Sequence, residues 1–186
     1  RVLFRSQSGY DISKLIDNDL TTQYHTYWYS VGIPDQLTFM FSPRVKSVKK
    51  IVYTPRTSGL NGVWTNLDVY YATQAAPDTF IKINATPIVW AANNVSKTYN
   101  FPTEISDVAK IRVIVNAGSG NFSSGNELQF FSSQPTAAAN DCMINSADLV
   151  NVGDIKVAPQ ATGSFASSYQ QNENIEKCDP LCSYVV

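Results

Sequence analysis

Short hydrophobic runs separated by turn residues dominate the first two thirds of the chain. Seven of them have the length and the β-branched or aromatic content of strands, namely residues 37–41, 50–54, 67–72, 80–83, 98–101, 111–115 and 128–131. Apolar and polar positions alternate in residues 67–70 and 111–115, as on a strand with one buried face. No stretch keeps the period of an amphipathic helix over about 11 residues, although a short helical turn fits residues 12–16. The pattern predicts an all-β fold, a sandwich or a barrel.

The composition changes near residue 132. Residues 1–132 hold all three tryptophans, whereas residues 133–186 hold three aromatic residues in total. The segment 132–140 is rich in serine and alanine and contains a proline, which is typical of a linker. We therefore expect one domain over residues 1–132, followed by residues 133–186 as a linker or as the start of a second module.

The net charge and the small number of histidine and cysteine residues argue against several classes of function. Lys and Arg number 14 against 15 Asp and Glu, so the net charge of −1 does not favour nucleic acid or an anionic membrane as a partner. No apolar run approaches the roughly 20 residues of a membrane span, and the first residues are too short and interrupted for a signal peptide. One histidine and three cysteines cannot form a familiar zinc site. Cys178 and Cys182 could close a small disulfide loop that leaves Cys142 odd, or all three could be reduced.

An oxygen-rich turn at residues 17–22 precedes an aromatic loop. Its residues Asp17, Asp19 and Thr22 are ligands of the kind that calcium takes, and an ordinary turn whose side chains bond their own backbone is the alternative. Residues 24–29 then contain four aromatic rings and His25. Rings exposed on a loop stack on the apolar face of a sugar, while some of these rings are expected to fill the core. No serine nucleophile motif accompanies His25, so catalysis is not expected.

Two further loops carry polar groups. Arg56 and Asn61 flank a turn, and together they offer hydrogen-bond donors and an acceptor that could bind neighbouring hydroxyl groups of a ligand. The alternative is that Arg56 only pairs with a surface carboxylate and that Asn61 only shapes the turn. The glycine-rich segment 118–127 lacks the spacing and the lysine of a phosphate loop. It is expected to present Phe122 and to bring Glu127 to the start of the last predicted strand.

Residues 6–132 resemble the discoidin, or coagulation factor V/VIII type C, superfamily, and more closely its family 32 carbohydrate-binding modules. The resemblance rests on the order and spacing of segments 16–26, 53–56, 59–62 and 126–130. It implies an antiparallel β-sandwich jelly roll of the galactose-binding-domain type. Tyr24 stands where the family often has tryptophan.

The resemblance also implies two sets of site residues. A structural calcium ion would be held by the backbone near Leu15 and by Asp17, Asp19, Thr22 and Glu127. A galacto-configured sugar would be held by His25, Trp28, Arg56, Asn61 and Phe122, with Trp64 or Tyr10 as alternatives to Phe122.

The function implied is that of a non-catalytic module that binds terminal galactose or N-acetylgalactosamine on glycans or glycoproteins. Such modules belong to secreted or surface-attached bacterial proteins and are joined to other domains, including glycan-degrading enzymes. Related discoidin domains bind phospholipid or protein, which is the alternative function. Segments 154–157, 166–169 and 175–177 weakly echo residues 8–14, as if a second module began there, and a serine-rich linker explains them equally well.

Overall fold

The structure, a computed structural model, describes residues 6–29, 32–133, 142–144 and 149–152. Two 3₁₀ turns, η1 and η2, and twelve strands account for its regular elements. In chain order these are η1 (Ile12–Leu15), β1 (Tyr24–His25), β2 (Asp35–Phe41), β3 (Ser47–Thr54), β4 (Trp64–Thr73), β5 (Ala76–Lys82), β6 (Ile88–Val89), β7 (Lys97–Ser106), β8 (Val108–Gly118), η2 (Ser119–Asn121), β9 (Ser124–Gly125), β10 (Glu127–Ser132), β11 (Cys142–Ile144) and β12 (Leu149–Val152).

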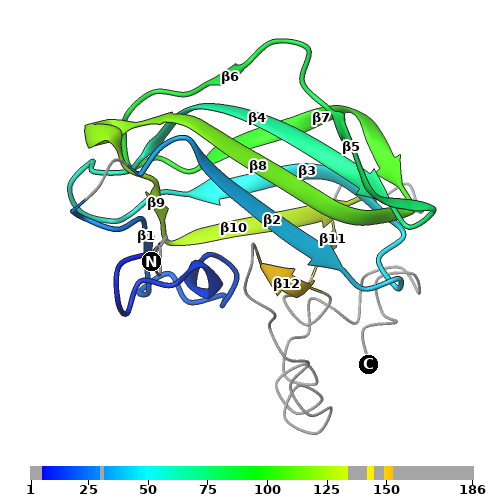
Figure 1. Cartoon of the computed structure of the whole chain (residues 1–186), viewed down its shortest axis with the longest axis horizontal. Helices are drawn as coiled ribbons and strands as arrows, with labels where there is room; N and C mark the ends of the chain where they lie inside the picture. Colours follow the sequence, from blue (N-terminus) through cyan, green and yellow to red (C-terminus); the bar gives the residue numbers. More distant parts are fainter. Residues whose placement is uncertain (1–5, 30–31, 134–141, 145–148, 153–186) are drawn as a thin grey trace, which may run out of the picture.

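The strands form two antiparallel sheets that pack face to face (Figure 1). One sheet has the order β11-β10-β3-β7, and the other has the order β12-β2-β8-β4-β5 with β6 beside β4. A separate two-stranded ladder joins β1 to β9 at one end of the sandwich. The predicted all-β antiparallel sandwich is confirmed.

The core lies between the sheets and is built from the inward positions of each strand. Phe39 and Phe41 on β2 meet Phe130 on β10, with ring centroids 5.2 and 5.1 Å apart. Tyr53 on β3 stacks on Trp64 on β4, with centroids 4.1 Å apart. These aromatic contacts join the two sheets, and burying such large rings supplies much of the hydrophobic stabilisation.

The seven predicted strands coincide with β2, β3, β4, β5, β7, β8 and β10, and the predicted helical turn coincides with η1. The strands β1, β6 and β9 have two residues each, too few to show any hydrophobic period, so the sequence pattern did not indicate them. Among the described residues, no helix is long and apolar enough to cross a bilayer.

Both sheets continue beyond residue 132. The strand β11 pairs with β10, and β12 pairs with β2, so each sheet gains an edge strand from the segment that follows the predicted boundary. The division of the chain at residue 132 stays a prediction. The echo segments of the tail, and Cys178 and Cys182 with their predicted loop, lie outside the described residues.

Candidate functional site

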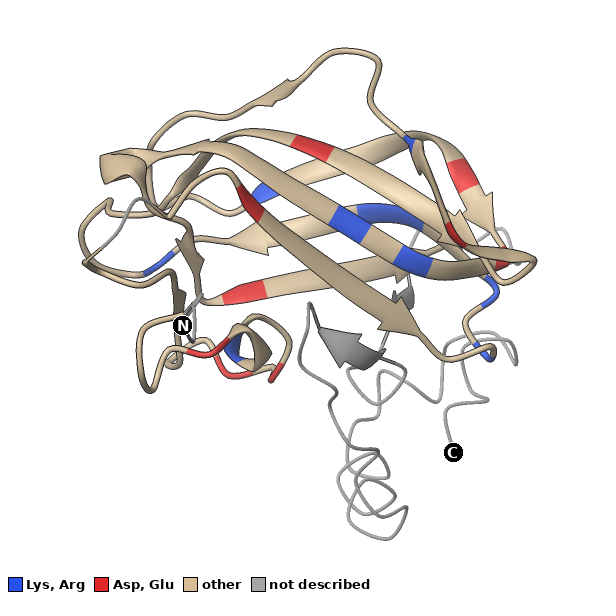
Figure 2. Ribbon diagram, in the orientation of Figure 1, with Lys and Arg blue, Asp and Glu red and all other residues tan. Residues whose placement is uncertain are grey.

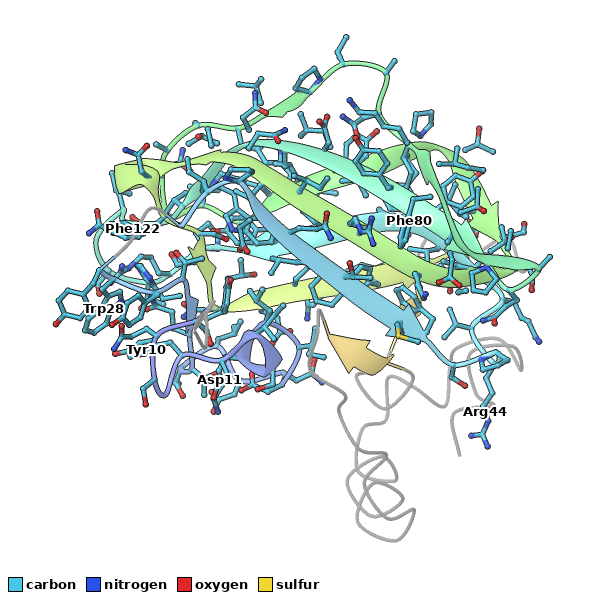
Figure 3. All side chains as sticks on the ribbon, viewed as in Figure 1. Tyr10, Asp11, Trp28, Arg44, Phe80 and Phe122 are labelled. Carbon is cyan, nitrogen blue, oxygen red and sulfur yellow. The ribbon has the colours of Figure 1, made fainter. Side chains whose placement is uncertain are left out.

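A pocket at one end of the sandwich gathers residues from four separate segments of the chain. It has a volume of about 360 Å³ and is lined by Tyr10, Gln23, His25, Trp28, Arg56, Asn61 and Phe122. Figure 3 shows Tyr10, Trp28 and Phe122 together at this end, far from Arg44 at the other. All five residues predicted to hold a sugar line this one pocket. That they bind a ligand stays a prediction.

His25 enters the pocket from the short ladder of β1 and β9, where it pairs with Ser124. The residue is only 4% exposed, and its Nδ1 donates to the carbonyl oxygen of Thr26 at 2.7 Å. Burial, together with the positive charge of Arg56, lowers the pKa of His25 below 6.5. A neutral ring whose Nδ1 carries the hydrogen keeps Nε2 as an acceptor, so His25 is prepared to accept a hydrogen bond from a hydroxyl group.

The turn that carries Arg56 and Asn61 is fixed through backbone groups. Arg56 donates from Nε to the Ser58 carbonyl at 2.6 Å and from Nη1 to the Asn61 carbonyl at 3.2 Å. The Ser124 hydroxyl donates to the same Asn61 carbonyl at 2.8 Å. The Asn94 amide donates to the carbonyls of Arg56 and Gly59 at 2.7 and 2.8 Å. Within the described residues, the side-chain amide of Asn61 has no hydrogen-bond partner, so it remains available to a ligand.

Aromatic rings form the walls of the pocket. Trp28 is 46% exposed and lies 5.5 Å from the ring of Tyr10, while Phe122 lies 5.3 Å from the imidazole of His25. Trp64, the other alternative to Phe122, is fully buried in the core and donates its Nε1 hydrogen to Ser123 Oγ at 2.9 Å. The geometry therefore brings Phe122 and Tyr10 to the pocket and leaves Trp64 out of it.

Sequence reasoning missed one lining residue, Gln23. It directly follows the acid-rich turn and precedes β1, and both residues of β1 are buried. The only signal in the sequence was its place between Thr22 and Tyr24, and a lone glutamine carries no motif.

The acid-rich turn bonds mainly to itself. Asp19 Oδ1 accepts from the backbone N–H and the hydroxyl of Thr21 at 2.8 and 2.6 Å, and Asp17 Oδ2 accepts from the Thr22 hydroxyl at 2.7 Å. These bonds are those of the self-bonded turn that the sequence allowed as an alternative to a metal site. In the part of the chain that the structure describes, no group of three or more His, Cys, Asp or Glu residues is arranged to hold a metal ion.

Glu127 nevertheless faces this turn with an unsatisfied carboxyl group. It is 1% exposed, and its Oε2 has no hydrogen-bond partner. Burial, reinforced by the negative charge of Asp17, raises the pKa of Glu127 to about 8. Figure 2 shows the acidic residues of the turn beside η1 and the acidic first residue of β10. The buried Oε2 of Glu127, which has no hydrogen-bond partner and lies near the acids of the turn, fits a hard cation such as calcium, which would supply positive charge there.

The ring of His25 predicts a pH dependence. We expect sugar affinity to be constant from pH 8 down to about 6.5 and to fall at lower pH, because a proton on Nε2 turns the acceptor into a donor. The lowered pKa also means that the unfolded chain binds this proton more tightly, so stability falls over the same acidic range. Calorimetric titration across pH, with unfolding measured in parallel, separates the two effects. An affinity that rises as the pH falls would contradict this role of His25.

Gly120 leaves space for the side-chain amide of Asn61, because it has no Cβ. Its φ is 70°, and a Cβ there would lie 2.8 Å from Asn61 Oδ1 and 3.4 Å from the ring of Phe122. Because the nearest atom is the end of a flexible side chain, Gly120→Ala is expected to displace the Asn61 amide and to weaken sugar binding about tenfold, or ~1.4 kcal/mol. Gly9→Ala is the matched control, since Gly9 has a φ of 81° and nothing within 4 Å. Equal sugar affinity in the two variants would count against the placement of Asn61.

Comparison with known proteins supports the fold. No family model matches the chain. It is 27% identical over 128 residues to an A type blood N-acetyl-alpha-D-galactosamine deacetylase of Flavonifractor plautii, and the match spans 68% of this chain but 16% of that protein. The family 32 carbohydrate-binding module of C. perfringens NanJ, solved in complex with galactose, is 28% identical, with a TM-score of 0.56 over 68% of this chain and 88% of that one.

An F5/8 type C domain from Bacteroides fragilis has the same fold, with a TM-score of 0.56 at 11% identity over 68% of this chain and 83% of that one. The two solved structures and this chain therefore share one β-sandwich fold. Of these two solved structures, the family 32 carbohydrate-binding module is the one that this chain also resembles in sequence, at 28% identity.

Proposed function

We propose that this domain is a non-catalytic module that binds terminal galactose or N-acetylgalactosamine on glycans. The observation that carries the proposal is the convergence of His25, Trp28, Arg56, Asn61 and Phe122 on one open pocket. The relatives support it, since the NanJ module was solved with galactose and the Flavonifractor protein is named an N-acetyl-alpha-D-galactosamine deacetylase.

The polar groups suit a sugar with an axial 4-hydroxyl. His25 offers a hydrogen-bond acceptor, and Arg56 offers N–H donors beyond the two that hold the turn. The side-chain amide of Asn61 offers a donor and an acceptor. Trp28 and Phe122 would bound the apolar face of the ring. A sugar with an equatorial 4-hydroxyl would leave some of these groups without partners, which costs binding energy and selects galacto over gluco sugars.

The pocket is expected to be shallow, because its residues come from four separate segments of the chain and no described segment covers it. Affinity for a single sugar is therefore expected to be weak, ~0.1–1 mM or about −4 to −5.5 kcal/mol. Attachment would be strengthened by further modules in the same protein through multivalency. We accordingly propose that the domain belongs to a secreted or surface-attached multidomain protein that acts on glycans or glycoproteins.

Calcium is the second part of the proposal. The residues Leu15, Asp17, Asp19, Thr22 and Glu127 would hold it, with Leu15 contributing its backbone carbonyl. The unpartnered Oε2 of Glu127 supports the proposal, because a bound divalent cation would offset the cost of burying that charge beside two other carboxyl groups. The ion would be structural, tying the turn to the first residue of β10.

A glycan array tests the proposed class of ligand. The wild-type domain is expected to bind glycans that end in galactose or N-acetylgalactosamine, and Asn61→Ala is expected to lose those signals. An array without any signal, together with binding to phospholipid vesicles or to a protein partner, would instead support the discoidin-type interaction domain.

A further inference from the structure

The pocket extends beyond the five residues that are proposed to hold one sugar. Tyr10 and Gln23 line it as well. Both residues are half-buried, and within the part of the chain that the structure describes, neither the Tyr10 hydroxyl nor the Gln23 amide has a hydrogen-bond partner. Polar groups that border a pocket without internal partners can bind a ligand. Their place in the pocket decides which part of a ligand they can reach.

Backbone hydrogen bonds fix the order of the segments across the pocket. The His25 N–H donates to the Tyr10 carbonyl at 3.1 Å, on one side of β1. The Thr26 N–H donates to the opposite side, to the Ser123 carbonyl at 2.9 Å, because successive residues of an extended chain direct these groups alternately. The strand β9, which follows Ser123, is in turn hydrogen-bonded to the turn that carries Asn61. Tyr10 and Asn61 therefore lie on opposite sides of β1.

Gln23 directs its side chain into the pocket beside His25. Tyr24, between them, points into the core, where it is 2% exposed and its hydroxyl donates to Asp35 at 2.8 Å. Neighbouring residues of an extended chain point to opposite faces, so Gln23 and His25 share the face opposite to Tyr24. Both of them line the pocket, as this alternation requires.

A row of rings crosses the pocket in the same direction. Between ring centroids, His25 lies 5.3 Å from Phe122 and 6.1 Å from Trp28. Trp28 in turn lies 5.5 Å from Tyr10. Phe122 borders Asn61, since both side chains approach the same glycine of η2. Figure 3 shows Phe122, Trp28 and Tyr10 one after another along this end of the sandwich. Trp28 and Tyr10 therefore form a second aromatic wall, away from Asn61.

The orientation of the sugar determines what reaches this second wall. The sugar proposed for the pocket has its axial 4-hydroxyl at Arg56 and Asn61. In a pyranose ring, C1 is the ring atom opposite C4, so a sugar held in this way directs C1 across β1 toward Tyr10. C1 is also the atom through which a terminal sugar is linked to the rest of its glycan. The next sugar of the glycan then lies over Tyr10, in the same pocket as the Gln23 amide.

We propose that Tyr10, Gln23 and the side of Trp28 that faces Tyr10 form a subsite for the penultimate sugar of the glycan. The inference rests on the proposed sugar site. The rings of Tyr10 and Trp28 would pack against the apolar face of the second sugar, and the Gln23 amide would donate to and accept from its hydroxyl groups. The domain would thus recognise a galacto-configured sugar together with the sugar to which it is linked.

Calorimetric or NMR titration with disaccharides tests this proposal. Lactose, N-acetyllactosamine, lacto-N-biose and melibiose are each compared with the methyl galactoside of the same anomeric configuration. At least one disaccharide is expected to bind the wild-type domain at least about fivefold more tightly than its methyl galactoside. The readout is this ratio of affinities, because a variant that merely disturbs the pocket weakens both ligands alike.

Gln23→Met and Tyr10→Ala are expected to lower the ratio to below about twofold, because the first removes the amide at nearly constant length and the second removes the ring. Gln36→Met is the matched control and should keep the wild-type ratio, since Gln36 is exposed on β2 and does not line the pocket. A wild-type ratio in either test variant would overturn the subsite.

Three other results would also contradict the proposal. Equal affinity of the wild-type domain for the disaccharides and the methyl galactosides would overturn the subsite and leave the sugar pocket standing. Variants that change only the preference for N-acetylgalactosamine over galactose would mean that Tyr10 and Gln23 contact the N-acetyl group instead. Wild-type protein that binds none of these sugars would overturn the proposed function and this inference together.

Discussion

Replacing Asn61 with alanine is expected to abolish detectable galactose binding while the domain stays folded. The Asn61 amide has no partner among the described residues, whereas its backbone carbonyl keeps the hydrogen bonds from Arg56 and Ser124 in the variant. Asn61 is not among the residues with positive φ, so alanine introduces no backbone strain. Losing the hydroxyl contacts should cost about 1–3 kcal/mol of binding free energy. From a starting Kd of ~0.1–1 mM, that loss raises the Kd roughly fivefold to 160-fold, which over most of this range is too weak for calorimetry.

Asn100→Ala is a matched control for this variant, because Asn100 is an exposed asparagine on β7 that does not line the pocket. It should bind galactose like wild type. Arg56→Ala should also lose galactose binding. Because it removes two hydrogen bonds that hold the turn, the loss could come either from missing sugar contacts or from a displaced Asn61. Wild-type affinity in Asn61→Ala would mean that the site has been placed wrongly.

Removal of calcium is expected to lower the melting temperature by about 5–10 °C. An ion that binds only the folded state stabilises it by mass action, by about 2.7 kcal/mol at a concentration one hundred times its Kd. A domain of this size shifts by roughly 2–4 °C for each kcal/mol. Thermal unfolding with calcium and after chelation measures the shift, and elemental analysis must establish that the ion is present in one sample and absent from the other. The same melting temperature in both samples would contradict the calcium site.

Chelation should weaken galactose binding as well. The proposed metal ligand Glu127 lies three residues after Ser124, which pairs with His25 in the β1 and β9 ladder and donates to the Asn61 carbonyl. A looser start of β10 therefore loosens two groups of the sugar pocket. By reciprocity, galactose should raise calcium affinity by the same factor that calcium raises galactose affinity. No change in galactose affinity on chelation would contradict this coupling.

The strands of the sandwich were predictable because their hydrophobic positions alternate over several residues. In β8, for example, Ile111, Val113 and Val115 are buried and the residues between them are half-buried. The ladder of β1 and β9 was not predictable in this way. Tyr24, His25 and Thr26 are all buried in succession, because they lie between other elements and not on one face of a sheet.

The pocket residues were predictable as types and spacings, but their arrangement required the structure. The sequence favoured Phe122 and left Trp64 and Tyr10 as alternatives, and only the fold shows that Trp64 stacks on Tyr53 in the core. Gln23 carries no motif and enters the pocket because the chain turns between Thr22 and β1. The hydrogen bond from the Asn126 amide to the Leu20 carbonyl joins positions 106 apart in the sequence, so no local pattern could indicate it.

Calorimetric or NMR titration of the wild-type domain with galactose, N-acetylgalactosamine and glucose tests the central claim most directly. The pocket of His25, Arg56 and Asn61 is predicted to bind the first two sugars at ~0.1–1 mM and glucose at least about tenfold more weakly. In an NMR titration, the resonances that shift should belong to residues that line this pocket. Glucose binding as tight as galactose binding, or shifts confined to another face of the sandwich, would contradict the account.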